Sequence, residues 1–289
     1  MSRESHAPAE SLPERLVRKS RRVAKEARRR LLNLTQGGAP DTRVVFIMGA
    51  QRSGTRVPLV ALESAPGILT YREGARPYFR NGRLQPDAEL DRLFAACQFP
   101  VLVIKPLSES HRAQELLARF PTSRVLWIFR RPEDTIRSAS IKWDSGGVAV
   151  SGLMDGTLPD DDWRRGGVTA EAMAEARALY RPGLSLQHAN AILWYLRSRL
   201  VLDLGLFDHP RVLVVRYEDL SSAPAAHFPR VFDFVGQPCR ESYLAGIHDR
   251  SVRRATLDDV PAEVVAACNQ LHTAIERRYL AQASSAGRA

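Results

Sequence analysis

Short apolar runs alternate with amphipathic stretches along most of the chain. Continuous runs rich in Val, Ile and Leu are typical of parallel strands whose two faces are both covered. The sequence predicts strands of this kind at residues 44–48, 101–104, 125–129 and 212–215. It predicts helices near residues 55–64, 109–119, 133–143 and 186–204. This order predicts an α/β domain of three layers (α/β/α) with a central, mainly parallel sheet and ligands at the carboxyl ends of its strands.

A basic segment precedes this alternation. Apolar residues recur at roughly helical spacing from Leu12 to Leu34, and Pro13 stands near the first helical position. Residues 12–34 hold nine Lys or Arg and two Glu, and so most of the net charge of +10. We expect a basic N-terminal helix, whose functional interpretations are peripheral contact with an anionic membrane or packing on a partner. The pattern favours instead a solvated helix that lies on its own domain or is partly disordered.

The pattern divides the chain into three parts. We expect a helical arm and linker over residues 1–40, one domain over 41–282 and a flexible tail over 283–289, after a last helix near 261–281. Residues 144–182 interrupt the rhythm with glycines and aspartates and are longer than a simple connector. We expect this polar, flexible stretch to be either a lid or acceptor-binding insert, or a passive surface insertion.

Composition excludes several classes of protein. No run approaches the ~18 to 20 apolar residues of a membrane span, and the N-terminus lacks the apolar region of a signal peptide, so we expect a soluble, cytoplasmic protein. Three widely spaced cysteines argue against a disulfide framework and a zinc site. The chain outside the arm is only mildly basic and indicates no nucleic-acid partner. The oligomeric state stays open.

The first predicted strand runs into a glycine-containing turn. Gly49 and Gly54 have the G-x-x-x-x-G spacing of a P-loop, whose backbone N–H groups converge on phosphate oxygens at a helix N-terminus. In an ATPase the next two residues are Lys and a Ser or Thr that holds Mg²⁺. Thr55 and Arg56 stand in those places here. The loop therefore predicts an anion site that works without a metal.

A second anion-binding pattern follows the strand at 125–129. Pro132 can begin a helix, whose free N–H groups and dipole favour negative charge. Arg130 would supply a forked charged donor and Ser138 a hydroxyl, with Lys142 on the same helix face. An ordinary capped surface helix would look similar. The pattern from Arg130 to Ser138 follows the loop by about 80 residues and comes after another strand of the same sheet, and this placement favours a second anion site.

The two motifs together resemble those of the sulfotransferases that use 3′-phosphoadenosine-5′-phosphosulfate (PAPS). The run Arg52-Ser53-Gly54-Thr55 resembles their 5′-phosphosulfate loop, in the form common to bacterial, carbohydrate and tyrosyl-protein members. The segment from Arg130 to Ser138 resembles their 3′-phosphate motif. The resemblance covers roughly residues 43–260. It implies a P-loop-like domain that moves the sulfuryl group of PAPS to a hydroxyl or amine and releases 3′-phosphoadenosine-5′-phosphate (PAP).

The resemblance implies further contacts with the nucleotide. Tyr217, in a Tyr-Glu-Asp-Leu run typical of the family, would help to line its site, whereas the two acids would cap and brace the following helix. Ser251, Arg253 and Arg254 lie where many members place a C-terminal loop over the nucleotide, although a solvated turn would look the same. Arg56 completes the expected cofactor-binding set.

Catalytic roles follow from the same resemblance. Arg52 and the loop backbone would stabilise charge on the sulfuryl group and leaving phosphate, and Lys105 would do so near the acceptor. A lysine whose stem lies along the sheet edge is the alternative for Lys105. Cytosolic members have a catalytic His two residues after that Lys, where Leu107 stands here. His111 lies further along and is a poor substitute.

Tyrosyl-protein members use a Glu that lies 21 residues after the loop Arg. That position is Glu73, just after a predicted second strand at 67–70, and we expect Glu73 to be the general base. The alternative is a surface Glu paired with Arg72 or Arg76.

Two other functions remain open at this point. A P-loop kinase or NTPase is disfavoured because the loop lacks its Lys and no acidic Mg²⁺ ligand ends a neighbouring strand. A non-catalytic module that binds PAP or another nucleotide is disfavoured because both Glu73 and Arg130 are present. The acceptor stays open among carbohydrate, lipid, small-molecule and peptide hydroxyls and amines.

Overall fold

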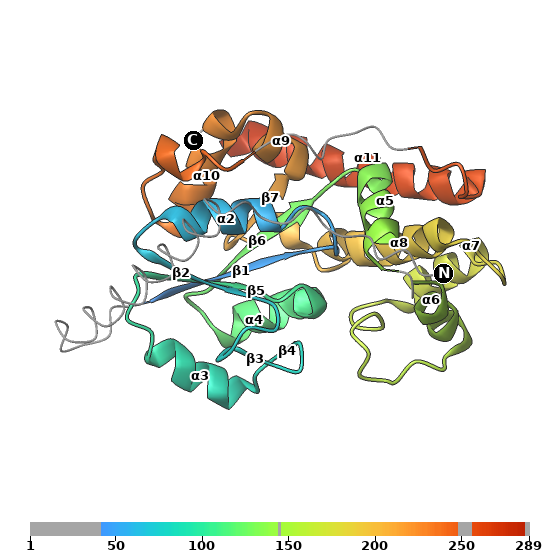
Figure 1. The fold of residues 1–289 in the computed structure, drawn as a ribbon, viewed down its shortest axis with the longest axis horizontal. Helices are drawn as coiled ribbons and strands as arrows, with labels where there is room; N and C mark the ends of the chain where they lie inside the picture. The colour runs from blue at the N-terminus through green and yellow to red at the C-terminus, as the bar shows by residue number, and fades with distance from the viewer. Residues whose placement is uncertain (1–41, 144–145, 248–255, 287–289) are drawn as a thin grey trace, which may run out of the picture.

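The computed structural model describes residues 42–143, 146–247 and 256–286. Its centre is a five-stranded parallel sheet of order β2-β5-β1-β6-β7 (Figure 1). The strands are β1 (Arg43–Gly49), β2 (Ile68–Arg72), β5 (Val101–Lys105), β6 (Arg124–Phe129) and β7 (Val212–Arg216). The parallel sheet and all five of its strands are therefore confirmed. The sequence did not predict a short antiparallel pair, β3 (Phe79–Arg80) and β4 (Arg83–Leu84).

The strands form because their apolar runs are buried on both faces. Phe46 and Met48 of β1 point into one core, and Val45 and Ile47 point into the other, as the two-residue period of a strand requires. The first core packs against α3 (Asp87–Ala95), α4 (Ala113–Arg119), α8 (Leu186–Asp203) and α11 (Ala262–Ala286). The second packs against α2 (Arg56–Ser64), α9 (Tyr217–Ser222) and α10 (Pro224–Val235). The predicted three layers are confirmed.

The stretch at 146–182 is more regular and more apolar than the sequence predicts. It contains α6 (Gly146–Asp155) and α7 (Ala170–Leu179), which pack on α8 around a separate apolar cluster. Val150 and Leu153 of α6 and the alanines of α7 supply the apolar contacts. The paired glycines at the start of α6 and the run of aspartates in the loop between the two helices hid this pattern in the sequence.

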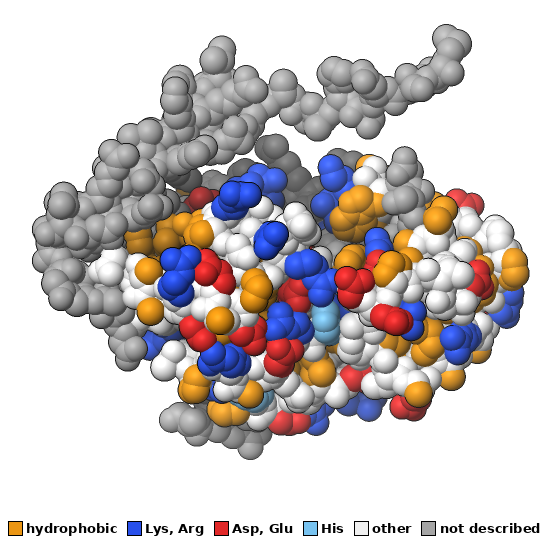
Figure 2. Space-filling view, turned by 90° about the horizontal axis from the view of Figure 1, so that it is seen from below, with side chains coloured by type: hydrophobic (Ala, Val, Ile, Leu, Met, Phe, Trp, Pro, Cys, Tyr) orange, Lys and Arg blue, Asp and Glu red, His pale blue; other side chains and the backbone are white. Residues whose placement is uncertain are grey.

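The loop between α6 and α7 is fixed to the sheet domain. Arg83 donates a hydrogen bond to the carbonyl of Asp161 (3.0 Å), and the ring of His111 lies against Gly166 and Gly167. His111 belongs to the 3₁₀ helix η1 (Leu107–Arg112) that follows β5. Figure 2 shows basic and acidic side chains intermixed across the middle of the face seen from below. The insert is thus docked by directed polar contacts as well as by apolar packing.

Several predicted features fall on residues that the structure does not describe. The basic arm over 1–40 and Ser251, Arg253 and Arg254 lie outside the described residues. Helix α11 runs to Ala286, five residues beyond the predicted end. Over the described ranges, no helix combines the length and apolar character that crossing a membrane takes.

Candidate functional site

The turn after β1 is shaped by residues with positive φ. Gly49, Arg52 and Gly54 have φ of 142°, 69° and 86°. The Ser53 hydroxyl donates to the carbonyl of Ala50 (2.6 Å), and the Ser53 backbone N–H donates to the same carbonyl (3.2 Å). Ser53 therefore holds the turn from inside, and we expect its neighbours to make the contacts with a ligand.

The turn ends at the N-terminus of α2. Within the described ranges, the backbone N–H groups of Gly54, Thr55 and Arg56 donate no hydrogen bond. Thr55 is the N-cap residue, and its side chain does not cap the helix. Free N–H groups at the positive end of a helix dipole form an anion-binding site. The loop thus presents free N–H groups of the kind that the predicted anion site requires.

Tyr217 fills the space beside the loop. A Cβ at position 54 would lie 2.0 Å from Cδ2 of Tyr217, so the ring packs where only glycine leaves room. On the ring lies the guanidinium of Arg130, with its Cζ 4.3 Å from the ring centroid. Arg130 is 6% exposed and lies 3.8 Å from the carboxylate of Asp134. The carboxyl ends of β1, β6 and β7 are therefore joined through one stacked contact.

The two predicted anion motifs meet at Arg52. Its Nε donates to the Ser138 hydroxyl (3.1 Å), and its own carbonyl accepts from Nη1 of Arg130 (3.4 Å). Its Cζ lies 5.8 Å from the ring centroid of Trp143. Burial and the nearby charge of Arg130 lower the pKa of Arg52. Two arginines held this close, with a serine hydroxyl between the motifs, favour a bound anion.

Glu73 and Lys105 lie together at the other side of the loop. Arg72 pairs in register with Lys105, so Glu73 emerges beside the end of β5. One oxygen of Glu73 accepts from the backbone N–H of Ser108 (2.7 Å). Burial lowers the pKa of Lys105, Glu73 opposes this shift, and the charges of Arg72, Arg52 and Arg56 add to it. Lys105 is therefore within electrostatic reach of both Glu73 and the loop.

Glu73 is not held by the surface arginines that were its alternative partners. Across the described ranges, Glu73 forms no ion pair with Arg72 or Arg76, and Arg72 instead lies 3.8 Å from Glu63 of α2. Glu73 is thus positioned by the turn after β5 rather than by a surface arginine.

The acids after Tyr217 have partners beyond the helix that they were expected to brace. Glu218 accepts from the backbone N–H of Arg131 (3.1 Å), so it holds the start of α5 (Pro132–Lys142), and it also accepts from its own backbone N–H in the first turn of α9. Burial raises the pKa of Glu218. Asp219 accepts from Arg216 and from the Tyr279 hydroxyl (both 2.7 Å). Both acids thus join segments distant in sequence, which their local pattern does not reveal.

Two predicted residues lie further from these contacts. Lys142 is exposed at the last residue of α5. His111 faces the insert, and burial together with Arg197 lowers its pKa to about 4. Sequence reasoning missed Ser110, whose hydroxyl accepts from the N–H of Gly49 (3.2 Å) and donates to its carbonyl (3.1 Å). No local signal marks that serine, because its partner lies 61 residues away.

Solved sulfotransferases resemble the chain in backbone. The enzyme from Alicyclobacillus acidocaldarius matches with 16% identity and a TM-score of 0.47, covering 84% of this chain and 95% of that one. The sulfotransferase domain from the curacin biosynthetic pathway matches with 16% identity and a TM-score of 0.48, covering 82% of this chain and 99% of that one. Mouse sulfotransferase SULT7A1, complexed with PAP, matches with 14% identity and a TM-score of 0.45, covering 87% of this chain and 91% of that one.

Neither a protein-family model nor a curated protein sequence matches the chain. At these identities and TM-scores the likeness concerns the course of the backbone.

Gly54→Ala should destabilise the protein by more than the backbone strain of an alanine with positive φ. Gly82→Ala is the matched control, because Gly82 has a φ of 77° and no atom lies within 4 Å of where its Cβ would stand. We expect Gly82→Ala to cost about 1 to 3 kcal/mol for the strained backbone. Gly54→Ala should cost at least about 2 kcal/mol more, since overpacking against Tyr217 adds to the strain. Urea unfolding of both variants measures the difference, and equal costs would contradict the contact with Tyr217.

Proposed function

We propose that the protein is a sulfotransferase that takes the sulfuryl group from PAPS. The observation that carries the proposal is the hydrogen bond from Arg52 to Ser138, with Arg130 donating to the Arg52 carbonyl. It joins two anion-binding motifs, at the ends of β1 and β6, into one basic surface. PAPS carries two separate anionic groups on one nucleoside and so matches a double site of this kind. A protein that binds only one phosphate group in a P-loop would need only the first motif, at the end of β1.

The residues fit PAPS in a specific way. The free N–H groups of residues 54–56 and the Arg52 side chain would hold the 5′-phosphosulfate. Arg130 and Ser138 would hold the 3′-phosphate, and Tyr217 would keep both the loop and Arg130 in position. When bound, PAPS supplies the sulfuryl group, which passes to the acceptor oxygen or nitrogen as PAP leaves.

Transfer also requires a proton acceptor and charge stabilisation. Glu73 would accept the proton of the acceptor hydroxyl, with its carboxylate held in place by the N–H of Ser108. Lys105, half-buried between Glu73 and the loop, would stabilise the charge that develops during transfer. Sulfuryl transfer, like phosphoryl transfer, depends mainly on positioning and electrostatics. These residues supply both.

PAP should bind much more tightly than ADP, because only PAP fills the 3′-phosphate site. Arg130→Ala should remove most of this preference, a loss of about 1.5 to 3 kcal/mol for a charged hydrogen bond. Arg137→Ala replaces an exposed arginine of α5, the helix that begins two residues after Arg130, and should leave the preference unchanged. Isothermal titration calorimetry with both nucleotides measures the preference. Equal affinities for PAP and ADP in the unmutated protein would refute the proposed cofactor.

Turnover, once an acceptor is identified, should survive EDTA. Thr55 and Arg56 stand where an ATPase has Lys and the Mg²⁺-binding hydroxyl. The measurement is product formation from labelled PAPS with and without the chelator. Loss of activity in EDTA with rescue by Mg²⁺ would instead support a P-loop kinase or NTPase.

Glu73→Gln should lower turnover by about 10² to 10⁴-fold, the usual contribution of a positioned base. The amide oxygen can still accept from Ser108, so PAP affinity should stay nearly unchanged. Glu63→Gln is the control, because that carboxylate lies on α2 near Arg72. Single-turnover kinetics with PAPS and a known acceptor provide the measurement. If Glu73→Gln keeps more than about a third of the activity, the base is another residue.

A further inference from the structure

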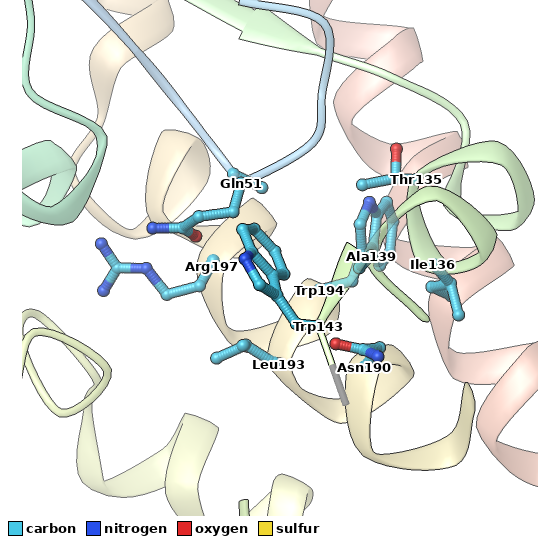
Figure 3. Close-up of a pocket in the computed structure, with 10 residues that line it drawn as sticks. Gln51, Thr135, Ile136, Ala139, Trp143, Asn190, Leu193, Trp194 and Arg197 are labelled. Carbon is cyan, nitrogen blue, oxygen red and sulfur yellow. The ribbon is translucent and has the colours of Figure 1, made fainter. Parts of the chain in front are cut away.

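A small pocket lies between the loop and two helices (Figure 3). Ala50 and Gln51 of the loop form one side, and residues of α5 and α8 form the other. Its apolar walls are Ile136, Ala139, Trp143, Leu193 and Trp194. Its volume is about 20 Å³, which admits one water molecule or the head group of a larger ligand.

The guanidinium of Arg197 on α8 forms part of this pocket and is 1% exposed. Its Nη1 donates to the carbonyls of Trp163 (3.1 Å) and Gly166 (2.8 Å). Its Nε and Nη2 are buried and have no hydrogen-bond partner among the described residues. These two groups form one edge of the guanidinium, the fork that binds a carboxylate through two parallel hydrogen bonds. Leaving buried charged donors without partners is costly.

Two more side chains of the pocket have polar atoms without partners, whereas Thr135 donates to the carbonyl of Arg131 and Asn190 donates to Ser140 and to the carbonyl of Leu186. Both amide atoms of Gln51 and the indole Nε1 of Trp194 are buried without a hydrogen bond in the described part of the chain. Figure 3 shows the Gln51 amide and the Arg197 guanidinium lying beside each other at one side of the pocket. Donors outnumber acceptors among these groups. The missing partner is therefore a group that mainly accepts hydrogen bonds.

The charge of Arg197 is not neutralised by a direct ion pair. Glu109 is the acid that acts most strongly on the charge of Arg197. It is 2% exposed and already accepts hydrogen bonds from Arg83 and Arg112. Asp162 is paired with Arg164 at 2.9 Å. Burial lowers the pKa of Arg197 to about 10, so it stays charged at neutral pH. An anion in the pocket would thus gain a full charge interaction in a dry setting.

We propose that the acceptor carries a carboxylate, which binds the free edge of Arg197 beside Gln51. This inference rests on the proposed transfer function. The pocket admits only the head group, so the rest of the acceptor lies across Trp143, which is 37% exposed. Trp143 also stacks near Arg52, with 5.8 Å between the Arg52 Cζ and the ring centroid. It therefore connects the carboxylate pocket to the loop that would hold the sulfuryl donor.

Benzoate and benzamide test the pocket, because they share shape and differ in charge. Calorimetric titrations with each, in the presence and absence of saturating PAP, measure the preference. We expect benzoate to bind at least about 10-fold more tightly, as a charged, forked hydrogen bond implies. Arg197→Lys should weaken the preference, since lysine keeps the charge but lacks the fork that binds both carboxylate oxygens. Arg199→Lys, on the same helix but held by Asp203 (2.9 Å), is the matched control and should keep it.

Arg197 also holds the insert, so its replacement can disturb folding. Leu193→Trp fills the pocket without removing a hydrogen bond, and it should abolish benzoate binding while PAP still binds. Equal binding of benzoate and benzamide to the unmutated, PAP-loaded protein overturns the carboxylate proposal alone. Benzoate binding that Leu193→Trp leaves intact overturns it too. Failure of PAP to bind, with the benzoate preference intact, refutes the transfer function and the acceptor role but keeps the anion pocket.

Discussion

The packing of Tyr217 against Gly54 is the contact on which the site depends. The aromatic ring occupies the space that a side chain at position 54 would need, and its other surroundings include the guanidinium of Arg130. Because Tyr217 follows β7, Gly54 follows β1 and Arg130 follows β6, one ring sets the spacing of three strand ends. Arg130 in turn donates to the carbonyl of Arg52, so the loop backbone and the second motif cannot shift independently.

The surroundings of Arg52 differ from those of arginines held in ion pairs elsewhere in the molecule. Arg112, for example, has three carboxylate partners, Asp87, Glu109 and Glu115. Arg52 has a serine hydroxyl and an aromatic ring instead, and burial lowers its pKa as it lowers that of Lys105. Neighbouring cations repel one another, and an anion bound between them would relieve that repulsion. The electrostatics of Arg52 and Lys105 are therefore compatible with an anionic ligand.

The sequence predicts the sheet and the loop well because both depend on local pattern. Runs such as 44–48 are apolar without interruption, and the glycine spacing after them defines the turn. The sequence fails where the deciding partner is distant. The helices of the insert are stabilised by α8, Glu218 holds the start of another helix, and Ser110 holds Gly49. None of these pairings leaves a periodic trace along the chain.

Gln51 and Arg197 show the same limit in the site itself. Gln51 stands at a position that the G-x-x-x-x-G pattern leaves unspecified. Arg197 has the sequence features of a surface residue on a long helix, but it is buried because the insert covers it. Once buried, Arg197 has two tasks, since one nitrogen donates to the carbonyls of Trp163 and Gly166 in the insert while the side chain also lines the pocket. One guanidinium thus contributes both to the docking of the insert and to the wall of the pocket. Any movement of the insert would change the direction of the fork, so docking of the insert and recognition of an anion are physically linked.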